Sequence, residues 1–223
     1  MLSNVKKPAF QAHTEWARDK PTRLLFLRHG ETDWNIERRI QGWKGTSLNA
    51  LGRRQARRAA RRLKDLALDA VVSSDLKRCL ETAHAVAGPR GLDVHTLREA
   101  RERCFGDWEG RKVEQVLESA GLSGQRKADP FFSLKPPGGE TMARFAARMG
   151  RLLNLLEARY RGRTVLVATH GGPVRIACCL VLGIPVEKYY LLGRPGNTSL
   201  TLVQSQGGTR WVEYYNDTAH LEG

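Results

Sequence analysis

Two histidines occupy equivalent places in the sequence, each after an apolar run and directly before a glycine. His29 follows Leu24–Leu27 and Arg28, and His170 closely follows Thr164–Ala168. Runs that are apolar at consecutive positions are typical of strands buried on both faces of a parallel sheet. Because open α/β sheets bind ligands at the carboxyl ends of their strands, an arginine and two histidines there indicate an anion site beside a nucleophile or base.

Each of these residues also has a purely structural explanation. Arg28 could cap a sheet edge, and His29 could satisfy a hydrogen bond of the core. For the first run alone, this explanation is as good as the functional one. A second histidine at an equivalent strand end, with a glycine that lets backbone N–H groups approach a ligand, favours the functional interpretation.

The composition suits one compact α/β domain, or at most two small ones. The chain has 223 residues, of which 41% are hydrophobic, and a formal net charge of +14. Such a charge favours anionic partners, which include nucleic acid, an anionic membrane surface and phosphorylated small molecules. Charge alone does not choose among these, and the excess of arginine has no functional explanation at this point.

Cysteine spacing and hydropathy give expectations about the compartment. The four cysteines lack a CxxC pair, so neither a zinc site nor a disulfide framework is expected, and free thiols indicate a cytoplasmic location. Residues 1–20 lack the apolar core of a signal peptide and are expected to form an N-terminal arm, in part disordered. His170 and Arg175 interrupt the apolar stretch Thr164–Gly183, which therefore predicts a buried strand and helix and no membrane span.

The order of strand and helix patterns predicts an α/β fold, a three-layer α/β/α sandwich with a mostly parallel central sheet. Strands are expected at 23–28, 70–74, 94–96, 164–168, 199–203 and 210–214, with the last two paired. Helices are expected from Asn49 with an apolar face to Ala67, and at 76–87, 113–120, 140–160 and 171–182. Asp75 is expected to cap the second of these helices, and residues 121–138 are expected to form a loop or lid.

Further polar blocks follow one another along the chain. They are Arg28–Thr32 with Asn35 and Gln41-Gly42, Ser74–Arg78 with Thr82, Glu102–Gly106 with Trp108, Pro137–Thr141, His170–Gly172 with Arg175, and Asn216–Leu221. Together the six blocks resemble the signature of the histidine phosphatase superfamily, the group that includes cofactor-dependent phosphoglycerate mutase. The resemblance covers residues 22–222 and implies a catalytic domain over 21–223.

The resemblance also implies a role for individual residues. His29 would be the nucleophile that takes a phosphoryl group on a ring nitrogen. Arg28, Arg78 and His170 would hold the phosphate, and Glu102 would protonate the leaving alkoxide and then activate water. The implied substrate-binding positions are Asn35, Gln41, Gly42 and Gly171.

These residue types suit phosphoryl transfer on physical grounds. The transferring group concentrates negative charge on oxygen, and two guanidinium groups supply fixed, protonated donors. A nucleophilic histidine must be neutral at the attacking nitrogen, and we expect a backbone carbonyl to hold its other nitrogen. The leaving oxygen needs an acid, for which Glu102 is expected to stay protonated near the bound dianion, with Glu99 and Glu109 as its rivals.

Three functions stay open. The first is a phosphomonoester hydrolase that acts through a phosphohistidine on a small phosphorylated metabolite, the second a cofactor-dependent phosphoglycerate mutase, and the third a non-catalytic basic module that binds nucleic acid or protein. The short separation of Gly106 from Gly138 and the segment Trp108–Gly110 favour the phosphatase branch, where the chain resembles alpha-ribazole and broad-specificity phosphatases. All expected reactive positions are present, which disfavours the binding module and, with it, nucleic acid as a partner.

No sequence pattern indicates a metal or a cofactor. The chain contains no HExxH motif, no paired-aspartate cluster and no phosphate-binding loop of the nucleotide-binding kind. The expected enzyme is therefore metal-independent and without a cofactor. The oligomeric state stays open, with a homodimer among the alternatives.

Overall fold

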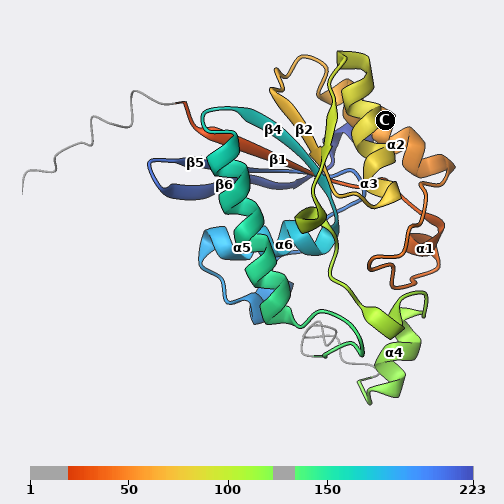
Figure 1. Cartoon of the computed structure of the whole chain (residues 1–223). Helices are drawn as coiled ribbons and strands as arrows, with labels where there is room; N and C mark the ends of the chain where they lie inside the picture. Colours follow the sequence, from red (N-terminus) through yellow and green to blue (C-terminus); the bar gives the residue numbers. More distant parts are fainter. Residues whose placement is uncertain (1–19, 123–133, 223) are drawn as a thin grey trace, which may run out of the picture.

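The computed structural model describes residues 20–122 and 134–222, which build a six-stranded sheet in the order β3-β2-β4-β1-β5-β6 (Figure 1). The strands are β1 (Thr22–Arg28), β2 (Ala70–Ser73), β3 (Val94–Thr96), β4 (Thr164–Thr169), β5 (Leu200–Gln206) and β6 (Thr209–Asp217). Neighbouring strands from β3 to β1 are parallel, and β5 is antiparallel to both β1 and β6. The prediction of a mostly parallel sheet is confirmed.

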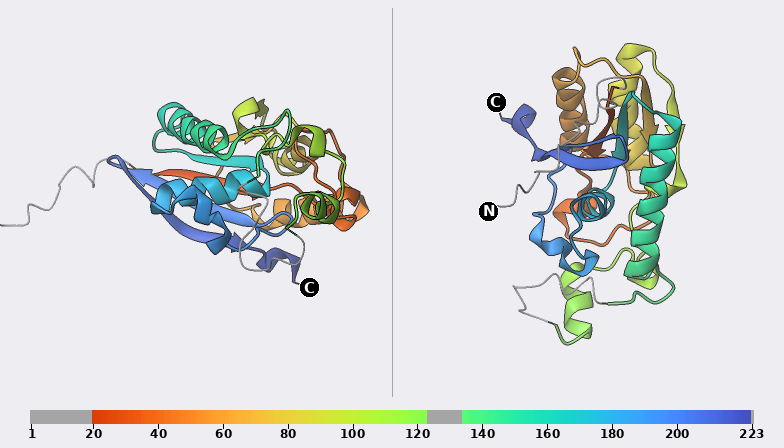
Figure 2. Two further views of the ribbon diagram at one scale, coloured as in Figure 1. Left: turned by 90° about the horizontal axis from the view of Figure 1, so that it is seen from below. Right: turned by 90° about the vertical axis from the view of Figure 1, so that its left-hand side faces the viewer.

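Helices cover both faces of this sheet, as Figures 1 and 2 show. They are α1 (Asp33–Ile36), α2 (Ala50–Arg62), α3 (Lys77–Ala87), α4 (Val113–Ser119), α5 (Met142–Arg159) and α6 (Gly171–Leu182). One core cluster joins α5 and α6 to one face, and a second joins α2 and α3 to the other. The predicted three layers are therefore present, whereas α4 lies away from the sheet in both figures.

The alternation of side chains along β1 explains why this strand is apolar at every position. Leu24 and Phe26 belong to the core cluster of α5 and α6, and Leu25 and Leu27 belong to the cluster of α2 and α3. A strand that is covered on both faces needs apolar residues at odd and even positions alike. The polar residues that follow such a strand lie at the edge of the core.

Three local expectations were wrong at helix ends. Asp75 does not cap α3, because its carboxylate pairs with the guanidinium of Arg101 at 2.5 Å. The helix expected to continue to Ala67 ends at Arg62. The helix expected from Glu140 begins at Met142 instead, because the Thr141 side chain accepts the N–H of the third helical residue and caps the helix.

The expected N-terminal arm and most of the expected lid at 121–138 lie outside the described residues. Within the part that the structure describes, no helix is both long enough and apolar enough to cross a membrane.

The register of the sheet brings the ends of β1 and β4 together, because Arg28 pairs with Thr169. The two histidines that follow these strands are therefore neighbours.

Candidate active site

His29 is buried directly after β1, and one of its ring nitrogens is held by the backbone. Its Nδ1 lies 2.7 Å from the carbonyl oxygen of Gly30. Because a carbonyl oxygen can only accept, Nδ1 carries the proton and Nε2 keeps its lone pair. The backbone acceptor expected from the sequence is thus Gly30, and Nε2 can act as a nucleophile.

Arg28 is buried beside His29 and has a donor without a partner. One terminal nitrogen donates to the carbonyl of Pro195, while Nε has no hydrogen-bond partner among the described residues. A buried donor that is left unpaired costs free energy until a ligand satisfies it. Burial, and then the charge of Arg194, lowers the pKa of Arg28 to about 9, so the guanidinium remains charged at neutral pH.

Arg78 comes from the start of α3 and joins the site to the second histidine. It donates through its terminal nitrogens to the carbonyls of Lys44 and Gly42, each at 2.8 Å, and through Nε to Nδ1 of His170 at 3.2 Å. Since the arginine Nε can only donate, Nδ1 of His170 accepts and Nε2 carries the proton. That Nε2 lies 3.0 Å from Oγ of Ser74, which can accept the proton.

Burial and positive charge keep both histidines neutral. The ring centroids of His29 and His170 lie 5.2 Å apart with the rings edge to face. Burial, followed by the charge of Arg78, lowers the pKa of each imidazole well below its usual value. The neutral form of His29 is the form whose Nε2 has a lone pair and can act as a nucleophile.

A cysteine near the two histidines is not a competing nucleophile. The sulfur of Cys79 lies 3.3 Å from Nε2 of His170. It also donates a hydrogen bond to the carbonyl oxygen of Thr169, at 3.3 Å. Burial raises the pKa of this thiol to about 12. Because the thiolate is the reactive form, Cys79 is inert at neutral pH.

Glu102 faces the cavity that His29 lines and is held by two backbone donors. Its Oε2 accepts from the N–H of Gly172 at 3.1 Å and its Oε1 from the N–H of Arg103 at 2.9 Å. A Cβ atom at position 172 would lie 2.0 Å from Oε1 of Glu102. Glycine at this position therefore allows the carboxylate to approach the start of α6.

The two rival acids have other surroundings. The carboxylate of Glu109 accepts from the backbone N–H groups of Trp43 and Phe105 and so joins two loops. The backbone carbonyl of Glu99 accepts from Arg148. Of the three candidate acids, Glu102 is the one that lines the cavity of the described residues.

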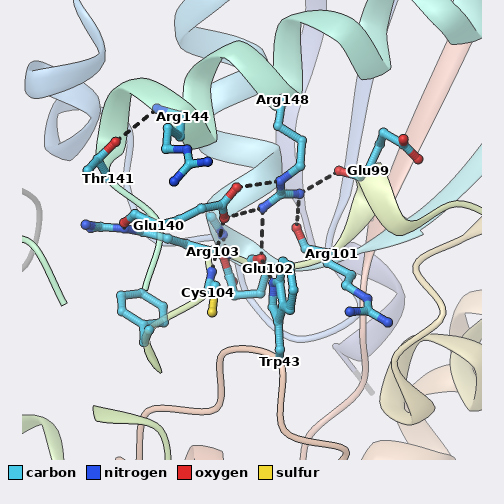
Figure 3. A network of polar contacts seen from close by, with 12 residues as sticks. Trp43, Glu99, Arg101, Glu102, Arg103, Cys104, Glu140, Thr141, Arg144 and Arg148 are labelled. Carbon is cyan, nitrogen blue, oxygen red and sulfur yellow. Dashed lines mark hydrogen bonds and ion pairs between the residues drawn. The ribbon is translucent and has the colours of Figure 1, made fainter. Parts of the chain in front are cut away.

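An ion pair behind Glu102 holds the segment that carries it, residues 99–104, which we call the acid segment (Figure 3). Arg148 of α5 is buried, pairs with Glu140 at 2.7 Å and donates to the carbonyls of three residues of the acid segment. Those residues are Glu99, Arg101 and Glu102. Nε1 of Trp43 donates to the carbonyl of Glu102 as well, at 2.7 Å. The backbone of the acid is thus fixed from two sides.

A cavity of about 210 Å³ brings nearly all expected site residues together. Those that line it are Arg28, His29, Asn35, Gln41, Gly42, Arg78, Glu102 and Gly171. His170 is completely buried and is not part of the cavity wall, since its ring nitrogens face Arg78 and Ser74. The structure therefore places His170 behind Arg78, where it orients the guanidinium.

Several residues of the site were not found by sequence reasoning. Asn197 donates to the carbonyl of His29 at 3.0 Å and to the amide oxygen of Asn35 at 3.2 Å. Arg148 holds the acid segment, and Arg194 lines the cavity. The pair of Arg148 with Glu140 was not expected either, although Glu140 lies in the block Pro137–Thr141. For Asn197, the turn residues Pro195 and Gly196 are a signal in the sequence, and they indicate a loop without showing where it lies.

The described residues contain no group of three or more histidine, cysteine, aspartate or glutamate side chains that could hold a metal ion. The charged side chains that line the cavity are mainly guanidinium groups, which bind anions through charge-assisted hydrogen bonds. The geometry is that of an anion pocket beside a neutral histidine and a carboxyl group.

Curated relatives cover most of the chain. A phosphoglycerate mutase-like protein 4 of Arabidopsis thaliana is 34% identical over 216 residues, which are 89% of this chain and 86% of that protein. Phosphoserine phosphatase 1 of Hydrogenobacter thermophilus is 30% identical and covers 89% and 94% of the two chains. Glucosyl-3-phosphoglycerate phosphatase of Mycolicibacterium vanbaalenii is 35% identical and covers 84% and 85%.

Solved structures and a family model agree with these relatives. YhfR of Bacillus stearothermophilus has a TM-score of 0.83 and 32% identity and covers 90% of this chain and 100% of its own. A chain of Escherichia coli assigned as an alpha-ribazole-5'-P phosphatase has a TM-score of 0.78 and 27% identity and covers 88% and 96%. The model of the histidine phosphatase superfamily (branch 1) matches residues 24–218. The chain therefore belongs to the histidine phosphatase superfamily.

Proposed function

We propose that this protein is a phosphomonoester hydrolase that acts on a small phosphorylated metabolite through a phosphohistidine at His29. The observation that carries the proposal is the state of His29, which is neutral, with Nδ1 bound to the carbonyl of Gly30 and Nε2 available. Arg28 and Arg78 supply the positive charge around it. Relatives named as phosphatases support the same activity.

The first step transfers the phosphoryl group to the protein. Nε2 of His29 attacks phosphorus while the bond from phosphorus to the ester oxygen breaks. Glu102 gives its proton to the leaving oxygen, so that an alcohol departs. Arg28 and Arg78 hold the non-bridging oxygens. The hydrogen bond from Nε of Arg78 to His170 fixes the orientation of the Arg78 guanidinium.

The second step returns the protein to its starting form. Water attacks the phosphohistidine, the bond from Nε2 to phosphorus breaks, and the carboxylate of Glu102 takes the proton from water. Inorganic phosphate leaves, and Glu102 is again an acid. No step requires a metal ion, because guanidinium groups provide the charge stabilisation that a metal would provide.

The test uses p-nitrophenyl phosphate with wild type, His29→Ala and the control His84→Ala, whose side chain is exposed on α3 outside the cavity. We expect His29→Ala to abolish hydrolysis and His84→Ala to retain it, with acid-labile, base-stable phosphate trapped on His29. EDTA should leave the rate unchanged. Hydrolysis by His29→Ala at the wild-type rate would reject the proposal, and so would phosphate trapped on a serine or an aspartate. A loss of activity with EDTA that a divalent ion restores would reject metal independence.

A mutase remains the second candidate, because several relatives are named as phosphoglycerate mutases or as phosphoglycerate mutase-like. Incubation with 3-phosphoglycerate separates the two activities. A phosphatase releases inorganic phosphate, whereas a mutase produces 2-phosphoglycerate without net release. Hydrolysis that depends on His29 would also exclude a module that only binds.

A further inference from the structure

The cavity is more positive than one phosphate group requires. Six arginines line it, and Glu102 is the single acidic residue among its described lining residues. The arginines are Arg28, Arg39, Arg78, Arg103, Arg175 and Arg194. A phosphomonoester dianion brings about two negative charges. The excess of positive charge indicates a ligand with more than one anionic group.

Most of these arginines are held by the protein itself. Five donate to backbone carbonyls: Arg28 to Pro195, Arg39 to Gly110, Arg78 to Gly42, Arg103 to Glu140 and Arg175 to Tyr189. Arg194 is exposed and makes neither a hydrogen bond nor an ion pair within the described ranges 20–122 and 134–222. Among the six arginines, Arg194 is therefore the one whose guanidinium is not held by a bond to the described part of the protein.

The loop that carries Arg194 is attached to the end of β1. The backbone N–H of Thr198 donates to the carbonyl of Arg28 at 3.1 Å, and the side chain of Asn197 donates to the carbonyl of His29 at 3.0 Å. Pro195 accepts from Arg28. These bonds fix residues 195–198 against the nucleophile, so Arg194 stands directly beside the fixed part of the loop, at the open side of the cavity.

The charge of Arg194 reaches the reacting residues. After burial, it is the largest cause of the lowered pKa of Arg28, and it also lowers the pKa of His29. Both effects require a short distance between the guanidinium and the anion pocket, since charge interactions weaken with distance and with screening. An anionic ligand that spans from His29 to the mouth of the cavity would meet this group.

We propose that Arg194 binds a second anionic group of the substrate, so that the site selects phosphomonoesters that also carry a carboxylate or a further phosphate. The planar guanidinium fork can hold either group through two parallel hydrogen bonds. This inference rests on the proposed hydrolase function, because it places the first phosphate at His29. It deepens that function by naming the class of substrate.

The test compares ligands that differ only in the second anion. 3-Phosphoglycerate and glycerol 3-phosphate form the carboxylate pair, and 1,3-propanediol bisphosphate and 3-hydroxypropyl phosphate form the phosphate pair. Dissociation constants are measured by titration calorimetry on the full chain with His29→Asn, so that bound ligands are not hydrolysed. The same background carries Arg194→Ala, Arg194→Lys or the control Arg54→Ala, which is exposed on α2 outside the cavity.

We expect the doubly anionic member of at least one pair to bind more tightly, and Arg194→Ala to reduce this preference about tenfold, as for the loss of one charge-assisted hydrogen bond. Arg194→Lys should keep part of the preference, and Arg54→Ala all of it. If Arg194→Ala reduces the preference in the carboxylate pair alone, the second anionic group that Arg194 binds is a carboxylate. If it reduces the preference in the phosphate pair alone, that group is a phosphate. Preferences that Arg194→Ala leaves unchanged in both pairs overturn the inference, whereas failure of the wild type to hydrolyse any phosphomonoester overturns the proposed function separately.

Discussion

At the scale of single residues, the site depends on which nitrogen of each histidine carries a proton. Gly30 takes the Nδ1 proton of His29, and Arg78 makes Nδ1 of His170 an acceptor. The two rings are thus opposite tautomers, and both are neutral because burial and nearby guanidinium groups oppose protonation. A neutral pair suits attack by one ring and orientation of Arg78 by the other.

We predict that the stability of the protein falls as pH decreases below the ordinary pKa of histidine, about 6.5. In the folded state His29 and His170 have pKa values well below that of the unfolded chain. Between the two values the unfolded chain binds protons that the folded chain excludes, so the free energy of unfolding decreases as pH falls. Urea denaturation at several pH values measures this dependence.

His29→Asn and His84→Asn isolate the histidine contribution from that of the carboxylates. Removal of His29 should make the loss of stability at acidic pH smaller, and removal of the exposed His84 should not change it. The same pH dependence in wild type and in His29→Asn would show that His29 is not buried in its neutral form.

At the scale of elements, the apolar runs and the polar blocks predicted most of the sheet and placed both histidines at neighbouring strand ends. The ends of helices were less predictable. Asp75 has a local sequence that suits a helix start, yet its carboxylate pairs with Arg101, which lies 26 positions away. Such a pair depends on tertiary contacts, which no local pattern contains.

The same reason explains which parts of the site the sequence missed. Family blocks name His29 and Glu102, but two of the side chains that donate to their backbone carbonyls come from loops far along the chain. Asn197 bonds to His29 across 168 positions, and Trp43 to Glu102 across 59. Only the folded sheet brings these segments together.

We predict that Arg148→Ala lowers both stability and turnover. The change leaves the half-buried Glu140 carboxylate without its partner and removes the donor of three carbonyls of the acid segment. Loss of one partner of a buried ion pair costs about 3 kcal/mol in the free energy of unfolding. Because the carbonyl of Glu102 is one of the three, we also expect kcat to fall more than the affinity for substrate changes.

Urea denaturation and steady-state kinetics of Arg148→Ala, Arg148→Lys and Arg144→Ala test this prediction. Arg144 is exposed on the same helix and serves as the control. Lysine keeps the charge but cannot donate both to Glu140 and to all three carbonyls. Arg148→Lys should therefore be more stable than Arg148→Ala but less stable than wild type, and its kcat should recover to a smaller extent than its stability. A kcat of Arg148→Ala equal to that of wild type would show that the pair does not position Glu102.

At the scale of the whole molecule, the positive charge extends well beyond the cavity. The formal net charge is +14, and the outer face of α2 carries the exposed arginines Arg54, Arg57 and Arg61, which form no ion pair within the described residues. These arginines belong to residues 21–223, which are predicted to act as one catalytic domain. A field of one sign over the surface raises the local concentration of anionic substrates and their rate of association.

We therefore predict that kcat/KM for an anionic substrate falls as salt rises, while kcat changes little. The Debye length shortens from about 30 Å at about 0.01 M to about 3 Å at about 1 M, which screens the surface charge more than the buried contacts at His29. A triple variant with Arg54→Glu, Arg57→Glu and Arg61→Glu removes two charge units at each position and takes the net charge from +14 to +8. It should have a lower kcat/KM than wild type at low salt and approach wild type at high salt. A difference that is equal at every salt concentration would show that the substitutions act through the structure, and a kcat/KM independent of salt would show that the arginines of α2 do not contribute to capture of the substrate.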